Sequence, residues 1–221
     1  PRNSLGEVSS LTGEKIAGES FLSTYGMGIF HQNIQGGEFI SLPYGLLSPD
    51  VMALEIYRDK LVVGGRAGLT YMDSTTFQYD EAIRDIAWDY SFISDIDASA
   101  EYLLIAARGG VFRQRHAQGG WERVLTKKDL ASDRIYSVAA GNDGNIMVAT
   151  ERNAYLFHES GMILQTLFPI GLDWPVFDIL YRSGQFYLST YYGLYIYDES
   201  TLQFISKVNS SGDILAISED A

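Results

Sequence analysis

The sequence predicts an all-β protein, and three observations support that class. Short runs rich in Val, Ile, Tyr and Phe recur between clusters of Gly, Asn, Asp and Ser, which is typical of strands joined by tight turns. Apolar residues at helical spacing are scarce. The chain of 221 residues has 22 Gly and 15 Tyr but only 5 Pro, a balance that favours many short strands and turns.

The composition excludes several kinds of protein. With 46% hydrophobic residues the chain can bury the core of one large domain, but its apolar runs are far shorter than the roughly 20 residues of a membrane-spanning helix. A net charge of -12 would repel a phosphate backbone, so we expect no nucleic-acid partner. Because the chain has no cysteine, disulfides, zinc–thiolate sites and cysteine nucleophiles are excluded.

One short motif divides the chain into repeats. An apolar residue, any two residues and a second apolar residue occur at residues 51–54 (VMAL), 93–96 (ISDI), 135–138 (IYSV), 176–179 (VFDI) and 214–217 (ILAI). Successive motifs start 42, 42, 41 and 38 residues apart. A period of this length corresponds to one supersecondary unit, so we expect each motif to begin the first strand of a unit.

Two further motifs predict the second and third strands. The second strand ends in small residues, at 23–24, 64–65, 106–107, 149–150 and 189–190. The third strand begins with a glycine and an apolar residue, at 28–30, 68–71, 110–113 and 193–196, and with Asn153 in place of glycine at 153–156. Since Asn tolerates a left-handed backbone, we expect Asn153 to adopt one.

A weaker fourth strand completes each unit, marked by residues 39–40, Phe77, 121–124, 162–164 and 204–205. Four strands in about 40 to 45 residues make one blade of a β-propeller, and the regular spacing disfavours an ordinary β-sandwich. We therefore predict a single propeller domain over residues 1–221, with about five four-stranded blades. Its repeats start near residues 8, 51, 93, 135 and 176, with a partial repeat from 214.

The motif at residues 214–217 has no blade behind it, which leaves two arrangements open. In one, this strand pairs with the first blade, and the termini close a ring of five blades. In the other, the chain is an arc of a larger propeller, and the motif begins its next blade. We favour the closed ring.

The repeats resemble those of a known family. Residues 176–198 and 135–157 are similar to the two-component-regulator propeller repeat, which has the apolar motif, an Asp-Gly turn, a strand ending in Gly-Thr or Ala-Thr, and Gly-Leu followed by an aromatic residue and Asp. Residues 46–51 are similar to that family's turn before the first strand. This chain lacks the Trp that family members often carry in the second strand, and Gly65 and Ala107 replace the Thr in two repeats.

The resemblance implies a periplasmic or extracellular sensor domain of a bacterial signal-transduction protein. Such a domain is linked to a histidine kinase, response regulator or nucleotide cyclase, and it meets the membrane only through segments outside this chain. Family members often respond to oligosaccharides, so the resemblance implies a glycan as a candidate ligand. We expect a non-enzymatic ligand-binding protein without a cofactor. The alternatives are a propeller enzyme acting on glycans and a scaffold for protein partners.

The loops that join second to third strands, and those that lead into first strands, surround one end of a propeller's channel. The residues predicted there combine cations with aromatic rings: Tyr25, Arg66, Trp88, Arg108, Arg152, Trp174, Tyr191 and Tyr192. This mixture suits stacking on sugar rings, pairing with carboxylates of an acidic glycan, or anchoring a protein partner. In the alternative interpretation, the arginines pair with Asp85, Asp89, Asp95 or Asp178 and hold blades together.

Other chemistry has weaker support. Asp85, Asp89, Asp95 and Asp97 are predicted near the channel mouth, where two close acids can act as general acid and base. Short acidic clusters are more often solvated loop residues, so we expect no catalytic site there. The three histidines, His31, His116 and His158, lack the spacing of metal ligands, and we expect no metal site.

Overall fold

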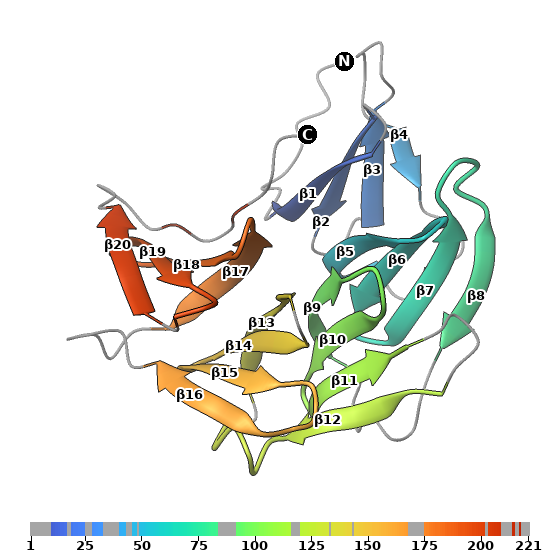
Figure 1. Ribbon diagram of the computed structural model, residues 1–221. Helices are drawn as coiled ribbons and strands as arrows, with labels where there is room; N and C mark the ends of the chain where they lie inside the picture. The colour runs from blue at the N-terminus through green and yellow to red at the C-terminus, as the bar shows by residue number, and fades with distance from the viewer. Residues whose placement is uncertain are drawn as a thin grey trace.

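A computed structural model describes residues 10–16, 19–24, 28–32, 40–42, 46–47, 49–83, 92–115, 120–132, 134–142, 144–167, 175–201, 203–208, 214 and 217. Within these ranges the chain forms twenty β-strands and no helix. The strands make five separate four-stranded antiparallel sheets, which lie side by side around a common axis (Figure 1). The predicted all-β class and the five blades are confirmed.

Each blade contains four consecutive strands, with the first strand nearest the axis (Figure 1). Blade 1 contains β1 (Ser10–Ile16), β2 (Glu19–Thr24), β3 (Gly28–Gln32) and β4 (Ile40–Leu42). Blade 2 contains β5 (Val51–Tyr57), β6 (Lys60–Gly65), β7 (Gly68–Asp73) and β8 (Tyr79–Ile83). Blade 3 contains β9 (Ile93–Ala98), β10 (Leu103–Ala107), β11 (Gly110–Gln114) and β12 (Glu122–Thr126). Blade 4 contains β13 (Ile135–Ala140), β14 (Asn145–Thr150), β15 (Ala154–His158) and β16 (Ile163–Leu167), and blade 5 contains β17 (Val176–Arg182), β18 (Gln185–Thr190), β19 (Gly193–Asp198) and β20 (Gln203–Val208).

The repeat motifs predict most strand positions. The first strands of blades 2 to 5 begin at the first residue of their motifs, whereas β1 begins at Ser10 and the predicted start near residue 8 lies outside the described residues. Phe77 does not lie in a fourth strand. It adopts a φ of 55° in the turn before β8, and its ring lies 4.9 Å from that of Phe21 in blade 1.

The turns follow the predicted chemistry with one exception. Ser183 and Gly184 join β17 to β18 with φ of 51° and 80°, as a two-residue hairpin turn requires. Gly110 begins β11 with a φ of 137°. Asn153 occupies the equivalent position in blade 4 without a positive φ, so the expected left-handed backbone is wrong there. The turn there is held by Thr150, whose Oγ1 accepts the Asn153 N–H at 3.1 Å and donates to the Asn153 carbonyl at 2.9 Å.

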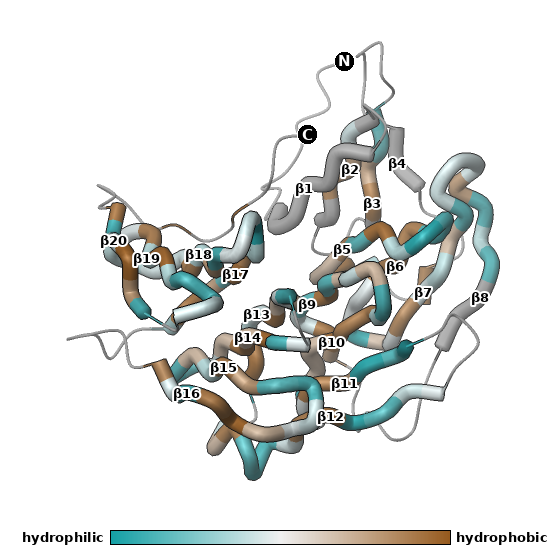
Figure 2. The backbone as a smooth tube through the Cα atoms, in the orientation of Figure 1, coloured by the Kyte–Doolittle hydropathy of each residue, from teal (hydrophilic) through white to brown (hydrophobic). Residues whose placement is uncertain are grey.

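The hydrophobic core lies between neighbouring blades. Each of four clusters joins two successive blades, as where Phe157 of blade 4 packs with Leu104 of blade 3. Small residues end the second strands because first strands crowd against them: a Cβ on Gly64 would overlap Ile93 of the next blade. A buried Leu or Ile contributes about 1.5–3 kcal/mol, so these interfaces are the main source of stability. Figure 2 shows hydrophobic residues along the outer strands β16 and β20 too, where Ile163, Phe204 and Ile205 are exposed.

The five blades form an open arc rather than a closed ring (Figure 1), so the arrangement that we favoured from the sequence is wrong. β1 pairs with β2 in a sheet made only of blade 1 strands. Residues 214 and 217 instead contact blade 5, where the Ile214 N–H donates to the Thr190 carbonyl at 3.2 Å and the Ile217 N–H donates to Asp178 Oδ2 at 2.7 Å. They thus contact blade 5 as a following first strand would.

Candidate functional site

The turns between second and third strands meet the residues that precede the first strands at one end of the blades. In blade 3 the Arg108 N–H donates to the Phe92 carbonyl at 3.2 Å, and in blade 4 the Glu151 N–H donates to the Arg134 carbonyl at 3.2 Å. We call this surface the rim. It comprises residues 49–50, 66–67, 92, 108–109, 134, 151–152, 175 and 191–192, together with Tyr136 and Phe177, the second residues of two first strands.

The arginines of the rim differ in their partners. Arg66 pairs with Asp50, with Nε–Oδ2 at 3.1 Å; this partner belongs to its own blade and is not one of the four aspartates considered from the sequence. Glu151 lies near two guanidinium groups, with Arg152 at 3.8 Å and Arg134 at 3.9 Å, and both arginine side chains are more than 70% exposed. Arg108 is exposed and forms no ion pair with a described residue. Blades 3 and 4 therefore present Arg108, Arg134 and Arg152 toward solvent.

Aromatic rings continue the rim across blades 4 and 5. The Phe177 ring meets Tyr191 edge to face at 4.6 Å between centroids, and Tyr136 lies 6.2 Å from Phe177 on the other side. Tyr191 and Tyr192 are 37% and 43% exposed, and the Lys207 ammonium lies 5.9 Å from the Tyr192 ring. We call Tyr136, Phe177 and Tyr191 the aromatic row. Sequence reasoning missed Tyr136 and Phe177, although both occupy the second position of the repeated motif.

Three residues predicted for the ligand site, Tyr25, Trp88 and Trp174, lie outside the described residues. The same holds for Asp85, Asp89 and His116. Of the eight residues predicted for the ligand site, Arg66, Arg108, Arg152, Tyr191 and Tyr192 lie in rim turns. Their place in the fold is as predicted, and their role in binding stays a prediction.

Asp95 and Asp178 have structural partners that the sequence interpretation did not foresee. Neither pairs with an arginine among the described residues; both contact Ser137 of the blade between them, with Ser137 Oγ at 2.6 Å from Asp95 Oδ2 and 3.1 Å from Asp178 Oδ1. Asp95 Oδ2 also accepts the Val138 N–H at 2.8 Å. The carboxyl groups thus lie on the first strands of blades 3 and 5 and are bridged by the first strand of blade 4.

These contacts follow one rule along the axis. The side chain at the third position of each motif accepts the N–H of the fourth residue in the next motif: Asp95 from Val138, Ser137 from Ile179, and Asp178 from Ile217. Asp97 repeats this two residues later by accepting the Ala140 N–H. The signal in the sequence is a polar third position in three motifs, whereas Ala53 and Ala216 occupy it in the others.

The environment of the two carboxyl groups disfavours their ionised forms. Burial raises the pKa of Asp95 well above its ordinary value, and the nearby Asp178 carboxylate raises it further. Burial also raises the pKa of Asp178, against the opposing effect of the N–H groups and the hydroxyl that it accepts from. A raised pKa is common in general acids, but here the carboxyl oxygens are engaged in contacts between blades.

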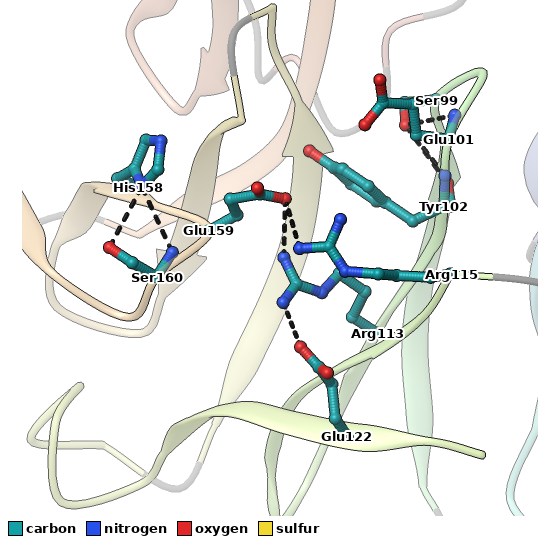
Figure 3. Close-up of polar contacts among 9 residues, drawn as sticks. All are labelled: Ser99, Glu101, Tyr102, Arg113, Arg115, Glu122, His158, Glu159 and Ser160. Carbon is teal, nitrogen blue, oxygen red and sulfur yellow. Dashed lines mark hydrogen bonds and ion pairs between the residues drawn. The ribbon is translucent and has the colours of Figure 1, made fainter. Parts of the chain in front are cut away.

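A second polar cluster lies away from the rim, between blades 3 and 4 (Figure 3). The buried Arg113 guanidinium donates to Glu159 Oε2 of blade 4 at 2.8 Å and pairs with Glu122 of its own blade. Arg115 contacts the same Glu159 oxygen at 2.9 Å. The Tyr102 hydroxyl is buried beside this cluster with no hydrogen-bond partner among the described residues, and burial raises its pKa to about 12. The two arginines and two glutamates of this cluster balance in charge, and their contacts join blades 3 and 4.

The described histidines have structural neighbours. His31 stacks on Phe21 with ring centroids 4.9 Å apart, and His158 Nδ1 lies 3.0 Å from Ser160 Oγ. Within the part of the chain that the structure describes, no group of three His, Cys, Asp or Glu residues is arranged to hold a metal ion. No helix in that part is long and apolar enough to cross a membrane.

Comparison with known proteins places the fold among β-propellers of diverse origin. No family model and no curated protein matches the chain. Among solved structures it is similar to the extracellular domain of the putative hybrid two component system BT4673 from B. thetaiotaomicron, with 15% identity over 94% of this chain and 29% of that chain and a TM-score of 0.71. The extracellular domain of BT3049 from the same organism gives 15% identity over 97% and 31% of the two chains and a TM-score of 0.70.

The computationally designed Ika8 protein is similar too, with 14% identity over 96% of this chain and 65% of that chain and a TM-score of 0.67. The chain spans less than two thirds of each of these proteins. At such identities the similarity shows the fold, which extracellular domains of two component systems share with a designed protein. The presence of two extracellular domains of hybrid two component systems agrees with the family that the repeats resemble.

Proposed function

We propose that this chain is part of a non-enzymatic sensor propeller outside the cytoplasm that binds an acidic oligosaccharide at the rim of blades 3 to 5. The repeat resemblance and the extracellular domains among similar structures support the sensor role. The single observation that carries the binding site is the aromatic row beside the exposed arginines of blades 3 and 4.

The chemistry of this surface supports the ligand class. Exposed Tyr faces stack against the apolar faces of sugar rings, and a guanidinium fork pairs with a carboxylate through two hydrogen bonds. Arg108 has no ion pair with a described residue to break before it binds. The chain as a whole is acidic, with a net charge of -12, so the exposed arginines of the rim would steer an anion to this end of the blades.

Isothermal titration with uronate-containing and neutral oligosaccharides of matched length tests this function. We expect binding of an acidic glycan that Arg108→Ala and Tyr191→Ala each weaken by about 10-fold or more, in line with 1–3 kcal/mol for a good contact. Tyr79→Ala is the matched control, because Tyr79 is 51% exposed on the outer strand β8. If only neutral glycans bind, the arginines have no role in recognising a carboxylate. If no glycan binds, a protein partner at the rim is favoured.

No catalytic role is proposed for the carboxyl groups at the axis. Asp95 and Asp178 accept hydrogen bonds from backbone N–H groups of the following repeats. Such contacts are explained by the packing of first strands and give the two carboxyl groups a structural role.

A further inference from the structure

The first strands of blades 3, 4 and 5 bring two carboxyl groups to one hydroxyl group. Ser137 on β13 is buried, with 1% of its surface exposed. Its Oγ lies within hydrogen-bond distance of both Asp95 Oδ2, at 2.6 Å, and Asp178 Oδ1, at 3.1 Å. The same oxygen accepts the Ile179 N–H at 3.0 Å.

The number of hydrogens available between Ser137 Oγ and the two carboxyl groups indicates their protonation state. A serine hydroxyl has one hydrogen to donate and two lone pairs that accept. If both carboxyl groups were ionised, the Ser137 hydrogen would serve one of them, at Asp95. Asp178 Oδ1 would then face a lone pair of Ser137 Oγ, and the two oxygens would share only the Ile179 N–H, which lies 2.9 Å from the first and 3.0 Å from the second. Both contacts are hydrogen bonds when one carboxyl group carries a proton and donates it to Ser137 Oγ, while Ser137 donates to the other carboxylate.

We propose that Asp95 and Asp178 hold one proton between them through Ser137, at pH values where an exposed aspartate has lost its proton, and that losing it weakens the junction of blades 3, 4 and 5. The step is a simple ionisation: the proton leaves to solvent, and the junction changes from one negative charge to two. The two carboxylates then repel each other across β13, and one contact with Ser137 is lost.

On the described strands that pack around the junction, the charged groups do not offset this repulsion. β10, β14 and β18, which pack against the first strands, contain no charged residue. β5 contributes the Glu55 carboxyl and β9 contributes that of Asp97, which both add negative charge. The cations on the packed strands are Lys60, which pairs with Asp80 at 3.0 Å, and Arg182, at the far end of β17.

The sign of the pH effect follows from linkage. The pKa of each carboxyl group is raised in the folded protein above the value of about 3.9 in an unfolded chain. The folded state therefore binds more protons than the unfolded state at pH values between the unfolded and the folded pKa. The stability that this proton confers is fully present below pH ~4 and is lost as the pH rises through the raised pKa of the pair.

Urea unfolding of the 221-residue chain from pH 5 to pH 9 tests the proposal. For the wild type we expect the folded-to-unfolded ratio to fall with rising pH, by up to about tenfold per pH unit, until the pair has ionised in the folded protein. Asp95→Asn should remove this fall, because the neutral amide leaves a single carboxylate at the junction, to which Ser137 can donate. Asp129→Asn is the control, since Asp129 lies in an exposed turn with its carboxylate already stabilised by Thr126, and it should keep the wild-type slope in this range.

Infrared spectroscopy with isotope-labelled aspartate gives a second measurement that does not depend on unfolding. We expect a protonated carboxyl band at pH 6 that disappears on raising the pH and is missing in Asp95→Asn. The same slope for wild type and Asp95→Asn, or the lack of a protonated band at pH 6, would overturn the proposal. If Asp95→Asn does not fold, Asp178→Asn removes the other carboxyl group, and the same outcomes apply.

Discussion

Arg113 of blade 3 donates a hydrogen bond to Glu159 of blade 4, with Nη1 and Oε2 2.8 Å apart. The Arg113 side chain is only 6% exposed, whereas Glu159 is 25% exposed and Glu122, its second partner, is 52% exposed. The buried member of this cluster is thus the cation. Removing a buried partner is costly because the opposite charges lose their neutralisation.

We expect Arg113→Met to lower the free energy of unfolding by about 2–3 kcal/mol, less than for a fully buried pair because both glutamates can be hydrated. Arg115→Met is the matched control. Arg115 contacts the same Glu159 oxygen but is 41% exposed, so its loss should cost less than about 1 kcal/mol. Urea unfolding measures both, and equal effects would contradict the burial argument.

The sequence predicted the blades well because their spacing depends on local chemistry. Val51, Ile93, Ile135 and Val176 begin first strands as expected, since each repeat has its own turns and small residues. Ring closure was not predictable from the repeats, because a motif at residues 214–217 suits either the first blade or a following one. The two arrangements are distinguished by β1, which takes the innermost place of blade 1 by pairing with β2, while Ile214 and Ile217 contact blade 5.

Two features of the structure require glycine at position 110, where β11 begins. The φ of Gly110 is 137°, and a Cβ there would overlap the backbone carbonyl of Leu125 on β12. We expect Gly110→Ala to cost more than about 3 kcal/mol in unfolding free energy, because strain and the broken β11–β12 pairing add.

Gly184→Ala separates these two effects. Gly184 also has a positive φ, 80°, but nothing lies within 4 Å of an added Cβ. Its cost should be only the backbone strain, about 1–2 kcal/mol. Thermal or urea unfolding of both variants checks the difference, and a Gly110→Ala cost no larger than that of Gly184→Ala would rule out the clash.

Removing the hydroxyl group should have opposite effects on the unfolding free energy at two buried tyrosines, Tyr155 and Tyr102. Tyr155 Oη donates to the Leu130 carbonyl at 2.9 Å and accepts from Asn153 Nδ2 at 3.1 Å, so Tyr155→Phe should cost about 1–2 kcal/mol. Tyr102 Oη has no partner among the described residues. Tyr102→Phe should therefore be neutral or stabilising by up to about 1 kcal/mol, since it removes an unsatisfied buried group. A loss of stability in Tyr102→Phe equal to that in Tyr155→Phe would show that Tyr102 has a partner in solution.

The candidate site was harder to predict than the fold, and the reason is physical. Arg108 and Tyr191 were found because turns at a fixed offset from the small residues must lie at one end of the blades. Tyr136 and Phe177 were missed because alternation places the second residue of a strand on a face that is not specified locally. A bulge in the pairing between first and second strands, at residues 135–137 and 176–178, interrupts the alternation there.

In acid, the unfolding free energy should depend on pH in the opposite direction from the dependence that the Asp95–Ser137–Asp178 junction causes. Asp129 lies in the turn after β12, where the Thr126 backbone N–H and hydroxyl donate to its Oδ2, both at 2.8 Å. These hydrogen bonds lower the pKa of Asp129 below its ordinary value, so the unfolded chain binds its proton more tightly than the folded protein. The stability that this carboxylate confers is present above pH ~4 and is lost as the pH falls through its folded pKa. We expect Asp129→Asn to flatten the loss of stability below pH 4 in urea unfolding, and an unchanged acid slope would show that the turn forms without the ionised carboxylate.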